Sequence, residues 1–329
     1  MHQQSIVIVT PALAEANNGN WQTARRWAGF LRAAYRVDVV GSWAAGDSPA
    51  DPSLMIALHA RRSAPSIAAW CAAHPRRPLL LVLTGTDLYR DIDHDASAQR
   101  SLDVADTLVV LNELGAQRLP ESLRAKTHVL LQSCPARQPL LDKTRHHLRA
   151  LMVGHLREEK DPQTYFRAAQ RLAARTDIWL DHIGDALDPA LGAQAKALAA
   201  ACPQYRWLGP QPHAATRRRI QGAHVLVHAS RMEGGAHVVT EAIRSGTPVL
   251  ASRIAGNLGL LGAGYTGTFD LGDDAALATL LEQARDDADM LPALCRQLAP
   301  RAALFAPEAE CATLSGLVAR LLGTPFPGV

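Results

Sequence analysis

The chain has 329 residues, of which 48% are hydrophobic and 20% are charged, and its formal net charge is +3. This composition is typical of a globular protein with two domains, and the charge is too small to indicate a nucleic-acid partner. The five cysteines are widely spaced and form no CxxC pair, which excludes a disulfide framework and a zinc ribbon. The sequence has no signal-peptide pattern and no apolar run of about 18 residues, so we expect a cytoplasmic protein without stable membrane association.

Short apolar runs alternate with helical patterns along the first 140 residues. The predicted strands are residues 5–10, 37–40, 54–58, 79–83 and 107–111, and the predicted helices include 21–34 and 67–74. Strands separated by helices form βαβ units with a parallel sheet. The segment 132–147, with its prolines and polar residues, is predicted to be a linker.

The same alternation restarts after the linker. Predicted strands are 148–153, 178–183, 205–208, 225–228, 248–251 and 268–271, and predicted helices are 162–174, 189–201, 216–221 and 238–245. Two further helices are expected at 275–285 and 309–322. The sequence therefore predicts an α/β protein with two doubly wound Rossmann-like domains facing a cleft, in regions 1–140 and 141–305. The remaining helix and tail, 306–329, are expected to pack back toward the N-terminal domain.

Several common catalytic motifs are missing from the sequence. The turn after the first strand, "PALAEANNGNWQTARRW", has one glycine where a dinucleotide fingerprint needs three. GxxxxGK[ST], HExxH and GxSxG are also absent. These absences argue against an NAD enzyme, a P-loop NTPase, a zinc protease and an α/β-hydrolase.

The stretch "MVGHLREEKDP" places cations where a strand ends. Asp161 and Pro162 are predicted to begin a helix as N-cap and first helical residue. His155, Arg157 and Lys160 then lie at the carboxyl ends of the strands, where open α/β sheets bind ligands. The alternative is a solvated turn with an exposed cation.

The stretch "RMEGGAHVVTE" joins a buried strand to a helix and has an acid at each end. Glycines at a helix N-terminus favour a bound phosphate, whereas Glu233 and Glu241 would accept hydrogen bonds from hydroxyl groups. A nucleotide sugar combines both kinds of group. Alternatively, Glu241 offsets the helix dipole at the surface and Glu233 only caps a loop.

With these segments, the second half resembles the GT-B glycosyltransferases of the family 4 type. The pieces that carry the resemblance are "GHLREEKDP", "HIGDA", "WLGPQPH" and "VLVHASRMEGGAHVVTEAIRSGTPVLASRIAGN". In that family the first piece reads G-R-L-x-x-x-K, so His155 replaces its arginine and Arg157 follows two residues later. Either side chain could supply the second cation.

The resemblance implies a donor site for a UDP-sugar that works without a metal. Lys160, with His155 or Arg157, would neutralise the diphosphate, helped by the backbone of Gly234, Gly235, Ala236 and His237. Glu241 would bind the ribose hydroxyls and Glu233 those of the sugar. Lys160 and Glu233 are thereby expected to be catalytic.

The N-terminal half is similar to the selenosugar synthases of the selenoneine pathway. This similarity is carried by "VTPALAEANNGNWQTARRWAGFLR", "ALHARRSAPSI", "LTGTDLYRDI" and "VVLNELGAQRLP". It implies transfer of a sugar of the GlcNAc or glucose type from a UDP-sugar to selenophosphate, with release of UDP and phosphate. It also implies a functional link to other enzymes of that pathway and no cofactor.

Under this interpretation the first domain binds the acceptor. Gly19 and Asn20 would hold the acceptor's phosphate at a helix start, with Asn20 also counted as catalytic. Thr84, Thr86 and Asp87 would line the same site, and His59 and Arg61 are further candidates. For His59 and Arg61 the alternative is a solvated loop.

Three further hypotheses remain at this point. The sequence "RDIDHD" contains Asp-x-Asp, a metal–diphosphate pattern of GT-A enzymes, but it lies away from the donor motifs and is expected to be solvated. An ordinary O-glycosyltransferase with a small-molecule or lipid acceptor is the alternative function, and a nucleotide-sugar-binding protein without turnover is the third.

Overall fold

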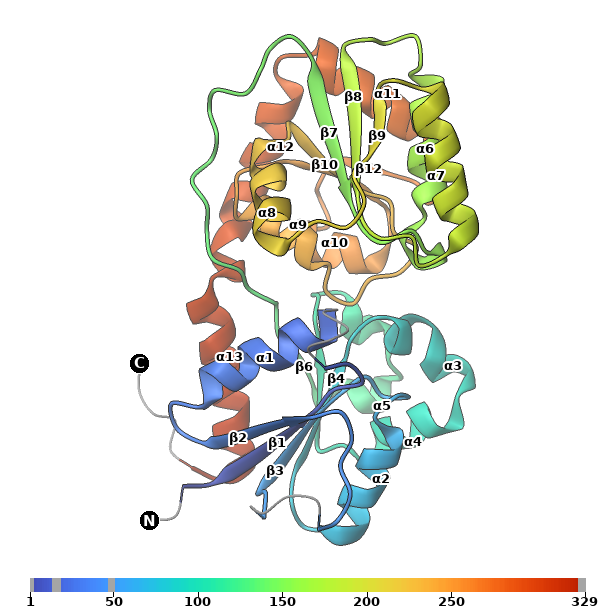
Figure 1. The fold of residues 1–329 in the computed structure, drawn as a ribbon. Coiled ribbons are helices and arrows are strands. Elements are labelled where there is room, and N and C mark those ends of the chain that lie inside the picture. Colours follow the sequence, from blue (N-terminus) through green and yellow to red (C-terminus); the bar gives the residue numbers. More distant parts are fainter. Residues whose placement is uncertain (1–2, 14–18, 47–50, 325–329) are drawn as a thin grey trace. The chain divides into compact units, whose positions relative to one another are not determined.

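The computed structural model describes residues 3–13, 19–46 and 51–324, and the chain divides into two compact units (Figure 1). The first unit comprises Met1–Ser133, Glu233–Gly235 and Pro307–Val329, and the second comprises Cys134–Met232 and Ala236–Ala306. The sequence places the boundaries at 140 and 305, a few residues away, and assigns all of 141–305 to one domain. The structure instead groups the short segment Glu233–Gly235 with the first unit.

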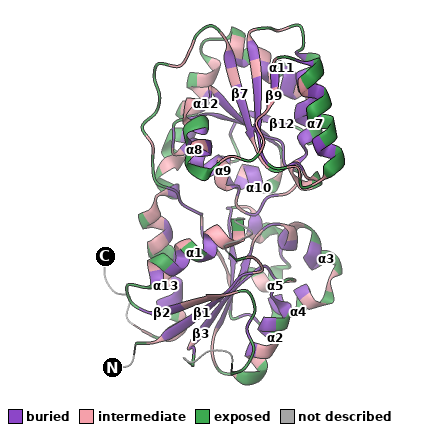
Figure 2. Cartoon of the chain, viewed as in Figure 1, coloured by how far each residue is buried: buried purple, intermediate pink, exposed green. Residues whose placement is uncertain are grey.

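The first unit is built on a six-stranded parallel sheet with the order β2-β1-β3-β4-β5-β6. Its strands are β1 (Ser5–Val9), β2 (Arg36–Val40), β3 (Leu54–Leu58), β4 (Leu79–Leu83), β5 (Thr107–Val110) and β6 (Thr127–Val129). Its helices are α1 (Gly19–Leu31), α2 (Ala64–Ala73), α3 (Ile92–His94), α4 (Ala96–Val104), α5 (Glu121–Arg124) and α13 (Pro307–Leu322), with short turns η2 (Asp87–Asp91) and η3 (Gly115–Arg118). β1, β3 and β4 are buried along their whole length and, apart from Ser5, are apolar, as expected for a parallel sheet covered on both faces (Figure 2).

Alternate residues of these strands point to two separate cores. On one face, Ile6, Ile8 and their neighbours pack against Trp27 of α1 and Leu314 of α13. On the other face, Val7 and Val9 belong to the cluster that contains residues of α2 and α4. The final helix thus supplies part of the first unit's core, although it lies at the other end of the sequence.

A buried carboxylate fastens this final helix. The Glu310 side chain has no exposed surface and accepts hydrogen bonds from Arg26 Nε at 2.7 Å and Trp27 Nε1 at 2.7 Å. It also accepts from the backbone N–H of Ser133 at 2.8 Å. One side chain therefore joins α13, α1 and the segment where the chain leaves the first unit.

The second unit contains another six-stranded parallel sheet, with the order β12-β11-β10-β7-β8-β9. Its strands are β7 (Leu148–Val153), β8 (Ile178–Ile183), β9 (Tyr205–Trp207), β10 (Val225–His228), β11 (Val249–Ser252) and β12 (Thr268–Phe269). Its helices are α6 (Pro162–Arg171), α7 (Pro189–Ala201), α8 (His213–Gly222), α9 (His237–Ile243), α10 (Ala255–Leu261), α11 (Asp274–Asp286) and α12 (Met290–Leu298), with turns η4 (Glu158–Lys160) and η5 (Ala299–Phe305).

The predicted fold class, two doubly wound α/β units with parallel sheets, is confirmed. The elements that the sequence does not predict are short or weakly patterned, such as β6, the π-helical turn η2, α10 and α12. No helix in the described part of the chain is long and apolar enough to cross a lipid bilayer.

Candidate active site

The two loops with the donor-type motifs meet at one place in the second sheet. β7 and β10 are neighbours, and the chain continues from β7 toward β8 and β9 but from β10 toward β11 and β12. The carboxyl ends of such a strand pair form the topological switch point where open α/β sheets bind ligands. Arg231 links the two loops, because its N–H donates to Glu159 O at 2.9 Å and its guanidinium to Asp161 Oδ1 at 3.3 Å.

The ends of β7 and β8 approach each other more closely than side chains would permit. A Cβ atom on Gly184 would lie 1.9 Å from Gly154 O, so only glycine fits. A Cβ on Gly154 would in turn lie 3.5 Å from Lys160 Cγ, which shows that the aliphatic part of Lys160 runs along this backbone. The two glycines therefore allow the backbone to form the close-packed surface against which the Lys160 side chain lies.

The start of α6 follows the prediction in part. Pro162 is its first residue, as predicted. Asp161 precedes it with a left-handed backbone (φ 43°), and its carboxylate makes no capping bond to the helix backbone. It accepts a hydrogen bond from Thr164 Oγ1 at 2.8 Å instead, and contacts Arg231. Asp161 is thus a support for the loop.

Of the two candidates for the second cation, the structure favours Arg157. The Nδ1 atom of His155 accepts the backbone N–H of Asp185 at 3.1 Å. Burial, with a further contribution from Arg157, lowers the pKa of His155. His155 is consequently neutral near pH 7, whereas a guanidinium stays charged and the Arg157 side chain is 42% exposed.

Glu241 is a buried and ionised carboxylate on α9. Only 2% of the residue is exposed. Its Oε1 atom lies 2.6 Å from His213 Nε2, 3.4 Å from His237 Nδ1 and 3.8 Å from Arg217. Burial would raise the pKa of Glu241, but the hydrogen bonds from His213 and His237 outweigh it and hold the pKa at about 2. Glu241 is therefore more than a surface acid that offsets the helix dipole.

The glycines after Glu233 have a structural role in addition to any ligand contact. A Cβ on Gly234 would lie 2.3 Å from Thr84 O, and the carbonyl of Gly234 accepts a hydrogen bond from Asn112 Nδ2 at 2.8 Å. A Cβ on Gly235 would come within 2.8 Å of Gln132 Oε1. These positions must be small because the protein's own backbone and side chains approach them. Glu233 is itself buried, and Ala236 precedes α9 as its N-cap residue.

In the first unit, Asp87 holds a turn together. Its Oδ1 accepts the backbone N–H groups of Thr84 and Gly85, each at 2.9 Å, and its Oδ2 accepts that of Ala60 at 2.9 Å. The residue is completely buried. Asp87 therefore orients the turn that carries Thr84 and Thr86, and its contact with the acceptor stays a prediction.

His59 follows β3 with a left-handed backbone (φ 76°), which is strained for a residue other than glycine. Its Nδ1 accepts the N–H of Arg62 at 3.3 Å, so the proton is on Nε2, which lies 3.1 Å from Thr86 Oγ1. Burial lowers the pKa of His59. Both ring nitrogens of this neutral imidazole are engaged. Arg61 is paired with Asp91 at 2.7 Å.

Gly19 and Asn20 form the first turn of α1, where Thr23 Oγ1 donates to Gly19 O at 2.8 Å. Gly19 is exposed and Asn20 is half-buried. The preceding part of the "NNGN" stretch lies outside the described residues. The structure thus puts this turn at the carboxyl-end side of β1, next to β3 in the sheet order.

Both aspartates of the Asp-x-Asp sequence form ion pairs with arginines. Asp91 pairs with Arg61 and Arg90, and Asp93 pairs with Arg118. Among the residues that the structure describes, no cluster of three or more His, Cys, Asp or Glu side chains is arranged to hold a metal ion.

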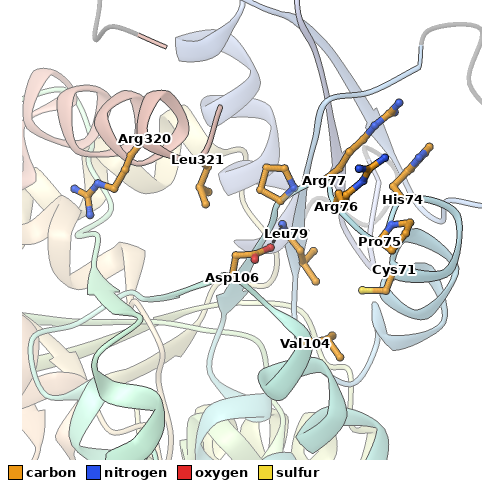
Figure 3. Close-up of a pocket in the computed structure, with 11 residues that line it drawn as sticks. Cys71, His74, Pro75, Arg76, Arg77, Leu79, Val104, Asp106, Arg320 and Leu321 are labelled. Atoms are coloured by element: carbon orange, nitrogen blue, oxygen red, sulfur yellow. Dashed lines mark hydrogen bonds between the residues drawn. The ribbon is translucent and has the colours of Figure 1, made fainter. Parts of the chain in front are cut away.

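A hollow of about 650 Å³ lies elsewhere in the first unit (Figure 3). Leu79 at the start of β4 and Asp106 just before β5 line it, so it opens at the amino-terminal edge of the sheet. Figure 3 shows Arg320 at one end of the hollow and Arg76 and Arg77 at the other. It shares none of the predicted site residues.

Three residues at these sites were not singled out from the sequence: Arg231, His213 and Asn112. Each follows a predicted strand, at the position where α/β sheets place ligand contacts, and that position was the only signal in the sequence. Their respective partners Asp161, Glu241 and Gly234 lie 70, 28 and 122 residues away in the chain. The pairings themselves therefore could not be predicted from local sequence patterns.

Comparison with known protein families indicates which class of reaction the protein catalyses. Residues 142–303 match the family model described as "Glycosyl transferases group 1". The second half of the chain is a group 1 glycosyltransferase domain. The match includes the loops of Lys160 and Glu241, and it makes the protein a glycosyltransferase.

Solved structures agree on the fold over nearly the whole chain. A sucrose-phosphate synthase from Thermosynechococcus elongatus is similar with a TM-score of 0.77 at 17% identity, covering 97% of this chain and 99% of its own. Anabaena HepE in complex with UDP and glucose has a TM-score of 0.73 at 14% identity, covering 98% and 100%. A glycosyltransferase from Rickettsia africae has a TM-score of 0.74 at 13% identity, covering 99% and 100%. These similarities confirm the GT-B fold class, and no curated protein sequence matches the chain.

Proposed function

We propose that this glycosyltransferase uses a UDP-sugar as donor and selenophosphate as acceptor, and so acts as a selenosugar synthase. The observation that carries the donor half is the switch point of the second sheet. There the Arg157–Lys160 loop after β7 is tied by Arg231 to the loop after β10, which leads into the helix of the ionised Glu241.

Each of these side chains suits one part of a UDP-sugar. Lys160 and Arg157 supply the positive charge that a departing diphosphate needs, so that no metal ion is required. The buried carboxylate of Glu241 is an acceptor for ribose hydroxyls, and Glu233 is assigned to the sugar hydroxyls. Anabaena HepE, which shares the fold, has been solved in complex with UDP and glucose and with UDP-glucose, and this supports the same donor class here.

The choice of acceptor rests on the similarity of the N-terminal half to selenosugar synthases. A feature of the first unit supports it: in Asp87 and His59, the two candidate bases, each carboxylate oxygen and each ring nitrogen already has a hydrogen-bond partner within the protein. An alcohol needs a base, because a hydroxyl is a weak nucleophile at neutral pH. The selenium of selenophosphate is already anionic and needs only to be placed.

The proposed reaction has two steps. Selenium forms a bond to C1 of the sugar while the bond from C1 to the UDP oxygen breaks, and UDP leaves with the electron pair. Water then cleaves the selenium–phosphorus bond, which gives phosphate and the selenosugar. Gly19, Asn20, Thr84 and Thr86 are assigned to the phosphate oxygens, since they are neutral groups that take no proton.

The decisive assay combines a panel of UDP-sugars with selenophosphate and detects the product by mass spectrometry. We expect UDP release and a 1-seleno-sugar with a GlcNAc- or glucose-type donor. Asn20→Ala should raise the KM for selenophosphate while the KM for the UDP-sugar stays unchanged. Faster transfer to phosphate or to a sugar alcohol would contradict the selenium acceptor and favour an O-glycosyltransferase. UDP-sugar binding without turnover by any acceptor would indicate a binding protein.

Glu241→Gln tests the donor site separately. We expect the KM for the UDP-sugar to rise about 10-fold or more with a smaller change in kcat, because a hydrogen bond to a charged group is lost equally in ground and transition states. Glu282→Gln on α11, where the side chain is 46% exposed, is the matched control and should leave both parameters unchanged. An unchanged KM with a collapsed kcat would show that Glu241 does not bind the ribose.

A further inference from the structure

The carboxylate of Glu241 is held from one side. His213, His237 and Arg217 all make their closest approach to the same oxygen, Oε1. Within the described part of the chain, these ionic contacts and the hydrogen bond from His213 leave Oε2 as the oxygen that can accept from a ligand. We call His213, His237 and Arg217 the Oε1 clamp. Because the buried carboxylate cannot rotate without breaking its contacts to the clamp, its other oxygen accepts hydrogen bonds in a fixed direction.

The residues of the Oε1 clamp come from two helices, α8 and α9. His213 and Arg217 are one turn apart on α8, and His237 and Glu241 are one turn apart on α9, so each pair shares a helix face. The shortest contact is the 2.6 Å hydrogen bond between His213 Nε2 and Glu241 Oε1. His213 is the most accessible member, with 64% of its side chain exposed, whereas Arg217 is 6% exposed.

We propose that His213 is a positioning residue for nucleotide recognition, which fixes Oε1 of Glu241 so that Oε2 accepts a hydroxyl of the donor's ribose. This inference rests on the proposed function, because it assumes that Glu241 faces the ribose. His213 acts through Glu241 and needs no contact with the nucleotide.

The same arrangement predicts a pH dependence of nucleotide affinity. The charged groups around His213 are Glu241, Arg217 and Arg137, and those around Glu241 also include His237. The hydrogen bond to Glu241 raises the pKa of His213, against the opposing effects of burial and the two arginines. The imidazolium is therefore present below this raised pKa and is lost as the pH rises through it. The clamp on Oε1 weakens in the same direction, so UDP should bind more weakly at high pH.

Titration calorimetry with UDP tests this inference. At about pH 6, His213→Ala should raise the Kd for UDP about 3- to 10-fold, which is the usual range for one hydrogen bond. His213→Gln should retain most of the affinity, because its amide N–H can still donate to Oε1. Between about pH 6 and about pH 9 the wild-type Kd should rise relative to that of His213→Gln measured at the same pH, since only the wild type loses the His213 charge.

Two controls separate the possible failures. Arg218→Ala removes an exposed side chain from the same helix and should bind UDP as the wild type does. In the double variant His213→Ala/Glu241→Gln, affinity should fall no further than in Glu241→Gln alone. Equal or tighter UDP binding by His213→Ala, or additive losses in the double variant, would overturn the role of His213 alone. If Glu241→Gln itself leaves the Kd unchanged, the donor-site assignment fails as well.

Discussion

Replacing Lys160 by alanine is expected to lower kcat/KM by about 10²- to 10³-fold, the usual effect of removing one preorganised charge from a developing anion. The leaving diphosphate gains negative charge as its bond to the sugar breaks. Lys160 lies at the end of η4, with its aliphatic part against Gly154, at the switch point of the second sheet. Its charge is thus placed before the reaction begins, and water cannot supply an equivalent.

The control for this variant is Lys196→Ala. Lys196 is exposed on α7, in the same unit but away from the loops after β7 and β10, and its removal should leave kcat/KM unchanged. Thermal unfolding of both variants should match that of the wild type. Full activity in a folded Lys160→Ala variant would remove the basis for the donor-site assignment.

Glu310→Ala is expected to lower the free energy of unfolding of the first unit by about 3–5 kcal/mol, as is common when one partner of a buried ion pair is removed. The substitution removes the acceptor that Glu310 provides to the Arg26 guanidinium, the Trp27 N–H and the Ser133 N–H. Each of these groups is buried or nearly so, and water cannot reach them easily. We expect α13 to detach from α1 at lower temperature or denaturant concentration.

Unfolding in urea, followed by tryptophan fluorescence, measures this effect. Glu308→Ala, which removes an acid two residues earlier on α13, is the matched control and should change stability little. Glu310→Gln should lie between the two, because an amide keeps an acceptor oxygen but loses the charge. A Glu310→Ala variant as stable as the wild type would show that α13 is held by its apolar contacts alone.

Strand positions were predictable because their signal is local. β3, β4, β7, β8 and β10 have the predicted bounds, since each is a short, mostly apolar and mostly buried run between turn signals. Helix ends shifted by a few residues, and α10 and α12 were not predicted. Their apolar periodicity is interrupted by Gly256, Gly259 and Pro292.

The loops of the candidate donor site could also be predicted from the sequence, because they follow predicted strands. Parallel strands place all their carboxyl ends at one edge, so residues after β7 and β10 had to lie on the same side of the sheet. The sequence pattern did not predict which hydrogen bonds each side chain makes. His155 and Arg157 look equivalent in sequence, yet only the structure shows that a backbone N–H occupies one nitrogen of His155.

The sequence by itself determined the parallel α/β architecture, the two-domain organisation and the loops that carry cations and acids, because these follow from local periodicity and chain order. Only the tertiary structure decided the burial and the partners of Asp87, Glu241 and Glu310. Each is a buried carboxylate whose partners come from other segments: Ala60 for Asp87, His213 for Glu241 and Arg26 for Glu310. A buried charge is tolerated only when such partners satisfy it, and the fold alone brings them together.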